Sequence, residues 1–186
     1  MSSRCTQTST CLKRSCSTPS RSVILGIDPG TTGMGYAFLV AAPERALLIE
    51  CGIVDVRASA TAGERLLAIS EALDELIRRH RPFALAVERL YFNKNARTAM
   101  RVSEARGIAL LCGARAGLEI AEYTPQQVKI SVTGNGRGDK KAVQRMLPNL
   151  VALDAPITQD NVADAVAIAL THAQRARFAD AVGAAT

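Results

Sequence analysis

The stretch from Val23 to Leu39 constrains this chain most, because it places a single carboxylate at the end of an apolar run. Val23 to Ile27 predicts a short buried strand, and the Pro and Gly residues that follow allow a tight reversal into a second strand at Tyr36–Val40. Asp28 therefore lies where a buried strand emerges. An isolated Asp-Pro-Gly is most often a simple turn, so a functional role depends on whether other carboxylates converge on Asp28.

Composition predicts one folded domain with a different segment in front of it. The chain has 186 residues, 48% of them hydrophobic and 22% charged, which is enough for one well-buried core. Residues 1–22 contain four basic residues and no acid, so the net charge of +6 falls to about +2 for the remainder. We interpret residues 1–22 as a disordered basic Ser/Thr-rich extension or the result of a start codon placed too early, 23–177 as the functional domain and 178–186 as a flexible tail.

Cysteine placement and hydropathy predict a cytoplasmic, reduced protein with no membrane segment. Three of the five cysteines lie in residues 1–22, where they lack the spacing and His partners of a zinc site. No disulfide framework is indicated. No run of eighteen apolar residues and no signal-peptide core is found.

The first half of the chain predicts a three-stranded antiparallel meander followed by a helix and a fourth strand. The third strand is expected at Leu47–Val56. From Gly63, apolar residues recur every three or four positions until His80-Arg81-Pro82, which predicts an amphipathic helix. Phe83–Val87 is a second wholly apolar strand, and it also ends in a carboxylate, Glu88.

The second half predicts further helices around one more strand. A helix is expected from about Asn95 to Ala116, with a stripe of mostly small apolar residues. The remaining elements are a strand at Leu118–Tyr123, a short helix from Thr124-Pro125 through Val132, a basic glycine-rich loop at 134–141 leading into a helix that Pro148 limits, and a final helix at Asp160–Arg177. This order predicts an α/β domain with a five-stranded mixed sheet flanked by helices, in which Asp28 and Glu88 share one edge if their strands are neighbours.

The final helix offers further oxygen ligands for the same edge. Asp160 and Asp164 are four residues apart and Asn161 and Asp164 three apart, so either pair can project from one face of the first turn. Asp160 can equally be a cap that complements the helix dipole. Oxygen donors without His or Cys suit Mg²⁺ or Mn²⁺, and two such ions about 4 Å apart can activate water against a phosphodiester.

Five segments, found in this order along the chain, are ILGIDPG at 24–30, AVERLYF at 86–92, EARG at 104–107, QVK at 127–129 and ADAVAIALTH at 163–172. Together they resemble the RuvC family of Holliday-junction resolvases. The resemblance implies a ribonuclease-H-like fold and a homodimer that uses acidic residues and Mg²⁺, two ions per subunit, to make paired symmetric nicks in four-way junctions during DNA recombination and repair. It also implies a branch-migration motor, RuvA and RuvB, as partner.

Residue by residue, the resemblance implies Asp28, Glu88 and Asp164 as catalytic metal ligands. The family usually has Asp or His three residues before the last Asp. Asn161 stands there in this chain, and an Asn carbonyl brings no charge, so we expect Asp160 to take the role through a small shift at the helix start. The glycines after Asp28 are interpreted as room for the DNA backbone and metal.

The resemblance also implies DNA contacts. Tyr91 takes the place of an aromatic residue that stacks on bases near the opened junction. Lys129 and Lys140 match basic positions at the scissile backbone, and Arg137 and Lys141 lie close to them in sequence. The small-residue stripe of the 95–116 helix is either the dimer interface or ordinary packing on its own sheet.

Two other functions remain as alternatives at this point. Asp28-Pro29-Gly30-Thr31-Thr32-Gly33 is also similar to the phosphate loop of actin-like ATPases and sugar kinases, although those folds need two such domains. The second alternative is a junction-binding protein that has lost cleavage because Asn161 replaces an acid.

Overall fold

The structure is a computed structural model that describes residues 23–30, 33–42, 44–56, 60–89, 96–136, 138–153 and 155–183. The expected extension at 1–22 therefore lies outside the described residues.

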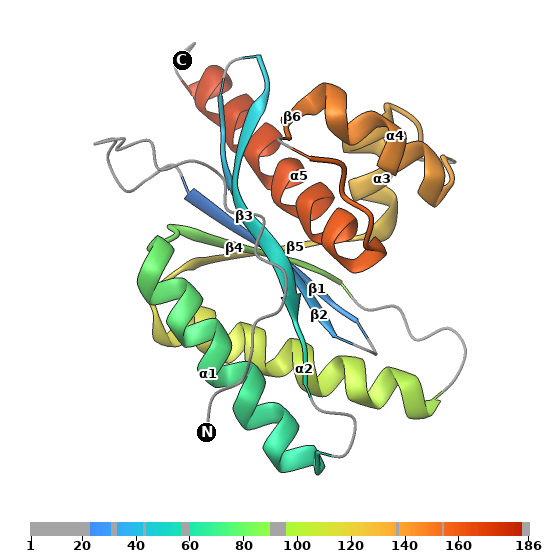
Figure 1. Ribbon diagram of the computed structural model, residues 1–186. Coiled ribbons are helices and arrows are strands. Elements are labelled where there is room, and N and C mark those ends of the chain that lie inside the picture. The colour runs from blue at the N-terminus through green and yellow to red at the C-terminus, as the bar shows by residue number, and fades with distance from the viewer. Residues whose placement is uncertain are drawn as a thin grey trace.

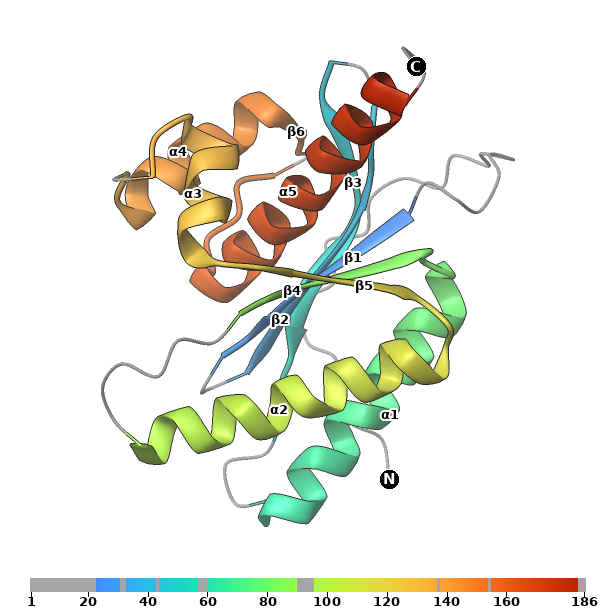
Figure 2. The same cartoon turned by 180° about the vertical axis from the view of Figure 1, so that it is seen from behind.

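Eleven elements follow one another along the chain. The strands are β1 (Val23–Pro29), β2 (Met34–Val40), β3 (Ala46–Val54), β4 (Ala84–Glu88), β5 (Glu119–Tyr123) and β6 (Val151–Ala152). The helices are α1 (Ala62–His80), α2 (Ala96–Arg115), α3 (Pro125–Thr133), α4 (Lys140–Leu150) and α5 (Asp160–Gly183). One twisted sheet separates α1 and α2 on one face from α3, α4 and α5 on the other (Figure 1), as the reverse view also shows (Figure 2).

The sheet has the order β5-β4-β1-β2-β3-β6. The predicted antiparallel meander is confirmed, because β2 pairs antiparallel with both β1 and β3. The predicted neighbours β1 and β4 are also confirmed as a parallel pair, in which Ile27 lies opposite Val87. The prediction of five strands is one short, since β6 pairs with β3 over only two residues. A strand of that length carries no hydrophobic alternation from which it could be predicted.

Alternation along the central strands decides which way the acids point. Leu25 and Ile27 of β1 belong to the core beneath α1 and α2, whereas Ile24 belongs to the core beneath α5. Successive strand residues face opposite sides, so Asp28 shares the face of Ile24. By the same rule Glu88 shares the face of Ala86, which also packs in the α5 core. Both acids are thus directed to the side of the sheet that α5 covers.

Helix α5 can lie very close to the sheet because β1 and β2 carry glycines beneath it. A Cβ on Gly26 would come within 2.3 Å of the Ala165 carbonyl oxygen, and one on Gly35 would come within 2.1 Å of the Asn161 carbonyl oxygen. These are backbone atoms, which cannot move aside as a flexible side chain would. The two glycines therefore set the depth at which the first turns of α5 rest on β1 and β2.

Two helix ends differ from the predictions. Pro148 was expected to limit its helix, but α4 continues to Leu150 with Pro148 inside it. Arg45 of the β2–β3 connection donates to the carbonyl oxygens of Pro148 and Val151 at 2.6 and 2.7 Å, which stabilises this last turn. The final helix was expected to end at Arg177, but α5 runs to Gly183, so residues 178–183 are helical.

The small-residue stripe of α2 packs inside the protomer. Ala105, Ala109 and Cys112 are buried in the core shared with α1 and the sheet. The Cys112 sulfur lies 3.5 Å from the Ser70 hydroxyl of α1. Of the two interpretations of this stripe, packing on its own sheet is therefore correct for these residues. Among the described residues, no helix is long and apolar enough to cross a membrane.

Candidate active site

The carboxyl ends of β1 and β4 bring two acids together, and α5 adds a third. Ile27 and Val87 are the last paired residues of β1 and β4. Asp28 directly follows Ile27 and Glu88 directly follows Val87, so the two acids emerge side by side at one edge of the sheet. Asp164 lies in the second turn of α5, between the buried residues Ala163 and Ala165. Its side chain is 32% exposed, which leaves it accessible beside two more buried acids.

Burial and mutual repulsion raise the proton affinity of Asp28. The pKa of Asp28 is raised to about 7, first by burial, then by the negative charges of Asp164 and Glu88, while Lys140 opposes the shift. A carboxylate that is desolvated and faces like charges disfavours its ionised form. Perturbed carboxyl groups gathered in this way are typical of functional sites. Asp28 is therefore a group that needs a cation nearby to remain charged at neutral pH.

Glu88 shows the same signature from the neighbouring strand. Burial and then the charge of Asp164 raise the pKa of Glu88, whereas Lys140 and Lys129 lower it. Lys129 lies on α3 and Lys140 at the first position of α4. Two of the lysines predicted at the scissile backbone are thus brought close enough to the acids to act on them electrostatically.

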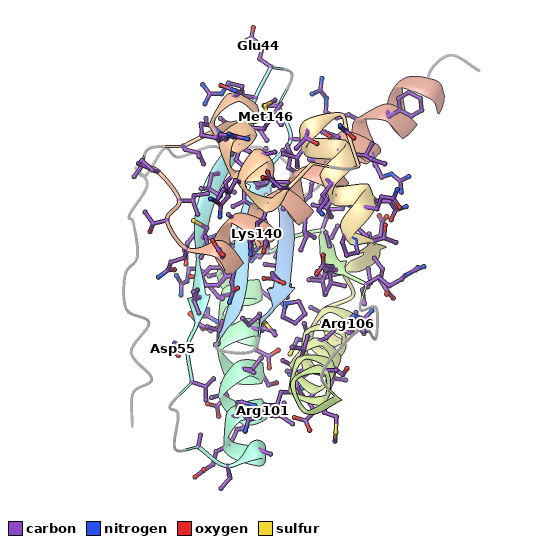
Figure 3. All side chains as sticks on the ribbon, turned by 90° about the vertical axis from the view of Figure 1, so that its right-hand side faces the viewer. Glu44, Asp55, Arg101, Arg106, Lys140 and Met146 are labelled. Atoms are coloured by element: carbon purple, nitrogen blue, oxygen red, sulfur yellow. The ribbon has the colours of Figure 1, made fainter. Side chains whose placement is uncertain are left out.

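Lys140 connects two acids of α5 through its ammonium group. Its Nζ lies 2.8 Å from Oδ2 of Asp164 and 3.3 Å from Oδ2 of Asp160. Partial burial would lower the pKa of Lys140, but the contacts with Asp164 and Asp160 outweigh it and raise the pKa. Asp139 caps α4 by accepting from the Ala142 backbone and so fixes the point at which Lys140 emerges. Figure 3 shows Lys140 near the middle of the molecule.

Asp160 stands at the edge of this cluster. Its side chain is 63% exposed, and it accepts a hydrogen bond of 2.8 Å from the Gln144 amide of α4. Hydrogen bonds from Gln144 and Lys140 lower the pKa of Asp160. Asp160 and Asp164 thus converge on one cationic point from successive turns of α5, while Asp160 stays more open to solvent.

Asn161 lies against the turn after β1. Its Nδ2 donates to the Gly33 carbonyl oxygen at 3.1 Å. A Cβ placed on Gly30 would meet Nδ2 of Asn161 at 2.5 Å, and one on Gly33 would meet the Ile53 side chain at the same distance. The protein itself fills the Cβ positions of these glycines, so its own packing requires them, and their role as room for DNA and metal stays a prediction. Gly30 lets α5 approach the Asp28 turn, and Gly33 lets the same turn lie against Ile53 of β3.

Arg106 is a site residue to which the sequence assigned no role. Its Nε donates to the Glu88 carbonyl oxygen at 3.2 Å, and its guanidinium pairs with Glu122 of β5. Arg106 therefore holds the end of β4 from the α2 side. The EARG segment was the available signal, but a contact with residues 16 to 18 positions away has no local pattern.

Of the other three predicted DNA contacts, the structure describes only Lys141. Lys141 is exposed on α4, next to Lys140, and forms no hydrogen bond or ion pair within the described part of the chain. Tyr91 and Arg137 lie outside the described residues.

The donor set suits a divalent cation in its chemistry. Asp28, Glu88 and Asp164 are near enough for their charges to act on one another, two of them have raised pKa values, and lysines supply the opposing charge. Hard cations such as Mg²⁺ take carboxylate oxygens and keep water ligands. In the part of the chain that the structure describes, no three acidic, His or Cys side chains are close enough to form a ready-made metal cage. The residues fit a metal that is held by few protein ligands and completed by water and phosphate.

A mixed sheet with this order and acids from β1, β4 and α5 at one edge defines a ribonuclease-H-like fold of the nuclease class. The family model described as crossover junction endodeoxyribonuclease RuvC matches residues 24–172. The chain belongs to this RuvC family, as the resemblance predicted.

Individual relatives agree with this assignment. The RuvC of Pelotomaculum thermopropionicum is 46% identical over 151 residues, covering 81% of this chain and 92% of the relative. A Thermus thermophilus RuvC structure matches with a TM-score of 0.78 and 34% identity, over 84% of this chain and 96% of that one. The T. thermophilus RuvC in complex with a Holliday junction substrate matches with a TM-score of 0.79 and 34% identity, over 86% and 97%. Family membership excludes the actin-like alternative.

Proposed function

We propose that this protein is an endonuclease that resolves four-way DNA junctions by paired hydrolysis of phosphodiester bonds, in recombination and DNA repair. The observation that carries the proposal is the convergence of Asp28, Glu88 and Asp164 at one sheet edge, where burial and mutual repulsion raise the pKa of the first two. Family membership supports the reaction class, and the junction complex of the T. thermophilus relative supports the substrate.

Asp28, Glu88 and Asp164 would hold the divalent metal, with Asp160 as the fourth ligand because it reaches the same cationic point as Asp164. Two Mg²⁺ ions per subunit, or Mn²⁺ in their place, would supply an activated water and stabilise the leaving oxygen. Lys129 and Lys140 lie where they can bind the scissile phosphate, and Lys140 must leave Asp164 to do so. Tyr91, Arg137 and Lys141 are proposed to contact the DNA.

The substrate has two strands to cut, so we propose a homodimer that presents two such sites. Met100 and Leu111 of α2 are 65% and 50% exposed. They are eleven residues apart, close to three helical turns, so they share one outer face of α2. This face is the proposed dimer contact, in place of the stripe that is buried within the protomer. The RuvA and RuvB branch-migration motor is the proposed partner, and the cytoplasm the proposed location.

The test is a labelled four-way junction incubated with purified protein, first in EDTA and then in Mg²⁺. We expect binding in both buffers and symmetric paired nicks only with Mg²⁺. Asp164→Asn and Asp160→Asn should abolish cleavage and retain binding, because each removes one ligand charge. Asp55→Asn is the matched control, since Asp55 is exposed directly after β3 (Figure 3). This variant should cleave the junction normally.

Binding without any cleavage in Mg²⁺ or Mn²⁺ would establish the non-cleaving alternative instead. Full cleavage by Asp160→Asn, together with loss in Asp164→Asn, would remove only Asp160 from the ligand set.

A further inference from the structure

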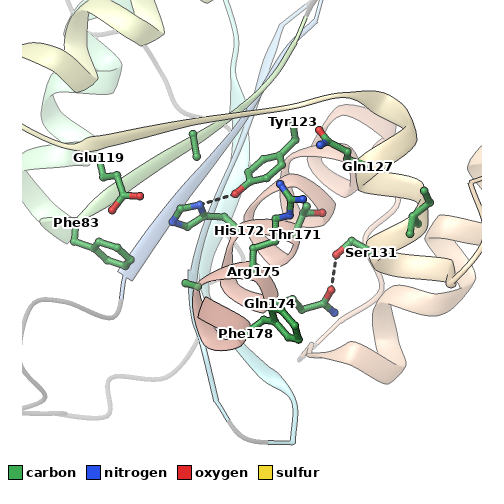
Figure 4. A pocket seen from close by; sticks show the side chains of 13 residues that line it. Phe83, Glu119, Tyr123, Gln127, Ser131, Thr171, His172, Gln174, Arg175 and Phe178 are labelled. Carbon is green, nitrogen blue, oxygen red and sulfur yellow. Dashed lines mark hydrogen bonds between the residues drawn. The ribbon is translucent and has the colours of Figure 1, made fainter. Parts of the chain in front are cut away.

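A hollow runs along β5, the edge strand that pairs with β4. It has a volume of about 730 Å³ and is bounded by β5, α3 and the C-terminal half of α5 (Figure 4). The lining runs from Tyr123, which pairs with Glu88, to Glu119 and Phe83 at the opposite ends of β5 and β4. Five residues of extended strand place Phe83 about 17 Å from Glu88. The part of the hollow near Phe83 and Glu119 is therefore separate from the acidic site.

His172 brings an unsatisfied polar atom to this hollow. The residue is only 5% exposed, and its Nε2 has no hydrogen-bond partner within the described part of the chain. Its other ring nitrogen, Nδ1, lies 2.8 Å from the Tyr123 hydroxyl. When the hydroxyl donates its single hydrogen to Nδ1, the neutral ring carries its own hydrogen on Nε2. A buried donor without an acceptor is costly, so Nε2 is poised for a ligand.

An acceptor accompanies this donor on the same side. Figure 4 shows the free ring nitrogen of His172 turned toward the side where Glu119 and Phe83 lie. Burial lowers the pKa of His172, and the negative charge of Glu119 opposes that shift, but in the described part of the chain the two groups form no ion pair within 4 Å. His172 Nε2 can donate a hydrogen bond and the Glu119 carboxylate can accept one. Together they can bind a ligand that presents an acceptor beside a donor. The edge of a purine base has this pattern.

A cation and aromatic rings complete the set. The Arg175 guanidinium lies 5.7 Å from the Tyr123 ring centroid and has no carboxylate partner in the described part of the chain. An Arg in this state is suited to phosphate. Phe178 is 73% exposed at the rim, and the Phe83 ring lies 6.0 Å from the His172 ring, centroid to centroid. Exposed aromatic faces are the surfaces on which bases stack.

We propose that this hollow binds a purine nucleotide, with the base between Phe83 and Phe178, its polar edge on His172 Nε2 and Glu119, and its phosphate on Arg175. Because Nε2 is closed to solvent in the free protein, the partly exposed Phe83 ring turns aside to admit the base and then stacks on it. The nucleotide comes either from solution or from an unpaired DNA strand, since both present the same base and phosphate.

The test uses the absence of tryptophan from the chain. Phe178→Trp places one fluorophore at the rim, and wild-type protein is titrated in parallel by calorimetry. The probes are adenosine and guanosine monophosphate, adenosine, ribose phosphate and a short single-stranded oligodeoxynucleotide. We expect saturable binding of a purine monophosphate that weakens about tenfold or more in Arg175→Gln and in Glu119→Gln. Arg177→Gln, a change on the same helix outside the hollow, is the matched control and should bind normally.

Tighter binding of the oligonucleotide would identify a DNA strand as the source, and tighter binding of the mononucleotide a free nucleotide. The proposal is overturned if no purine probe saturates the protein, if ribose phosphate binds as tightly as the monophosphates, or if Arg177→Gln weakens binding as much as Arg175→Gln. Arg175→Gln and Glu119→Gln leave Asp28, Glu88 and Asp164 in place, so both variants should still cut a four-way junction in Mg²⁺ at saturating protein, and failure here is separable from failure of the proposed nuclease function.

Discussion

Asp28 couples protons, cations and stability at a single residue. The pKa of Asp28 is raised to about 7 in the folded chain, against 3.8 for an unperturbed Asp side chain. The folded protein therefore holds this proton more tightly than the unfolded chain does. The stability that Asp28 contributes is complete below about pH 4, and it is lost as the pH rises through about 7. Above that pH the folded protein carries a cluster of charges that only a cation relieves.

Asp28→Asn should consequently stabilise the metal-free protein at about pH 8 by about 1 to 3 kcal/mol, and the difference should shrink toward about pH 4. Thermal melting in EDTA across this range measures it. Mg²⁺ should raise the melting temperature of the wild type but not of Asp28→Asn, and its affinity for the wild type should rise with pH as the proton leaves. A stability difference that does not change with pH would contradict this account of Asp28.

Asn161 stabilises the folded protein as an uncharged hydrogen-bond donor. Its amide donates to Gly33, and a carboxylate cannot donate. Asn161→Asp should lower the stability of the metal-free protein by about 1 to 2 kcal/mol more than Asn161→Ala, because it adds a negative charge beside the Asp28 turn. Mg²⁺ should raise the melting temperature of Asn161→Asp more than that of Asn161→Ala. Equal melting temperatures for the two variants in EDTA would show that the added charge has no effect there.

For single residues, the sequence predicts the acids of the site better than it predicts the long-range hydrogen bonds around them. Asp28 and Glu88 could be predicted because each ends a wholly apolar strand, and Asp164 because it interrupts an apolar helix face. The bond from Asn161 to Gly33 joins residues 128 positions apart and depends on the packing of a helix on a turn. No periodicity encodes such a contact, and the same holds for Arg106 and the Glu88 carbonyl.

Among the elements, α5 packs closely on β1 because Gly26 has no side chain. Gly26→Ala should destabilise the protein by about 1 to 3 kcal/mol, because the new Cβ would overlap the Ala165 carbonyl 2.3 Å away. The melting temperature should fall by about 2–4 °C per kcal/mol. Cleavage should fall more steeply than stability, since Asp164 moves with α5. Gly63→Ala is the matched control, because nothing lies within 4 Å of its Cβ position. A fully active Gly26→Ala would show that α5 can shift without disturbing the acids.

The order and type of the main elements could be predicted from periodicity and turn residues, whereas β6 and the end of α4 could not. The end of α4 depends on Arg45, which lies more than 100 residues before the carbonyl groups it binds, and β6 depends on its two-residue pairing with β3. Without that guanidinium, Pro148 is a reasonable place to end a helix. Long-range hydrogen bonds therefore account for both errors.

For the whole molecule, the outer face of α2 is the proposed contact between two copies. Leu111→Glu should convert the dimer to a monomer by placing a charge in an apolar contact. Sedimentation or size-exclusion with light scattering measures this mass. The monomer should retain its fold by circular dichroism but lose paired nicking. Leu67→Glu is the matched control, since Leu67 is 59% exposed on α1 and should leave the mass unchanged. An unchanged mass for Leu111→Glu would place the dimer contact elsewhere.

The distribution of the acids over β1, β4 and α5 also determines when the site can exist. During synthesis, Asp28 and Glu88 can pair within the sheet before Asp164 has left the ribosome, because α5 follows every described strand along the chain. A nascent chain therefore cannot assemble all three acids, however well its sheet has formed. Proteolytic fragments without α5 lack the same acid. If cleavage needs Asp164 as proposed, we expect incomplete copies without α5 to leave DNA uncut.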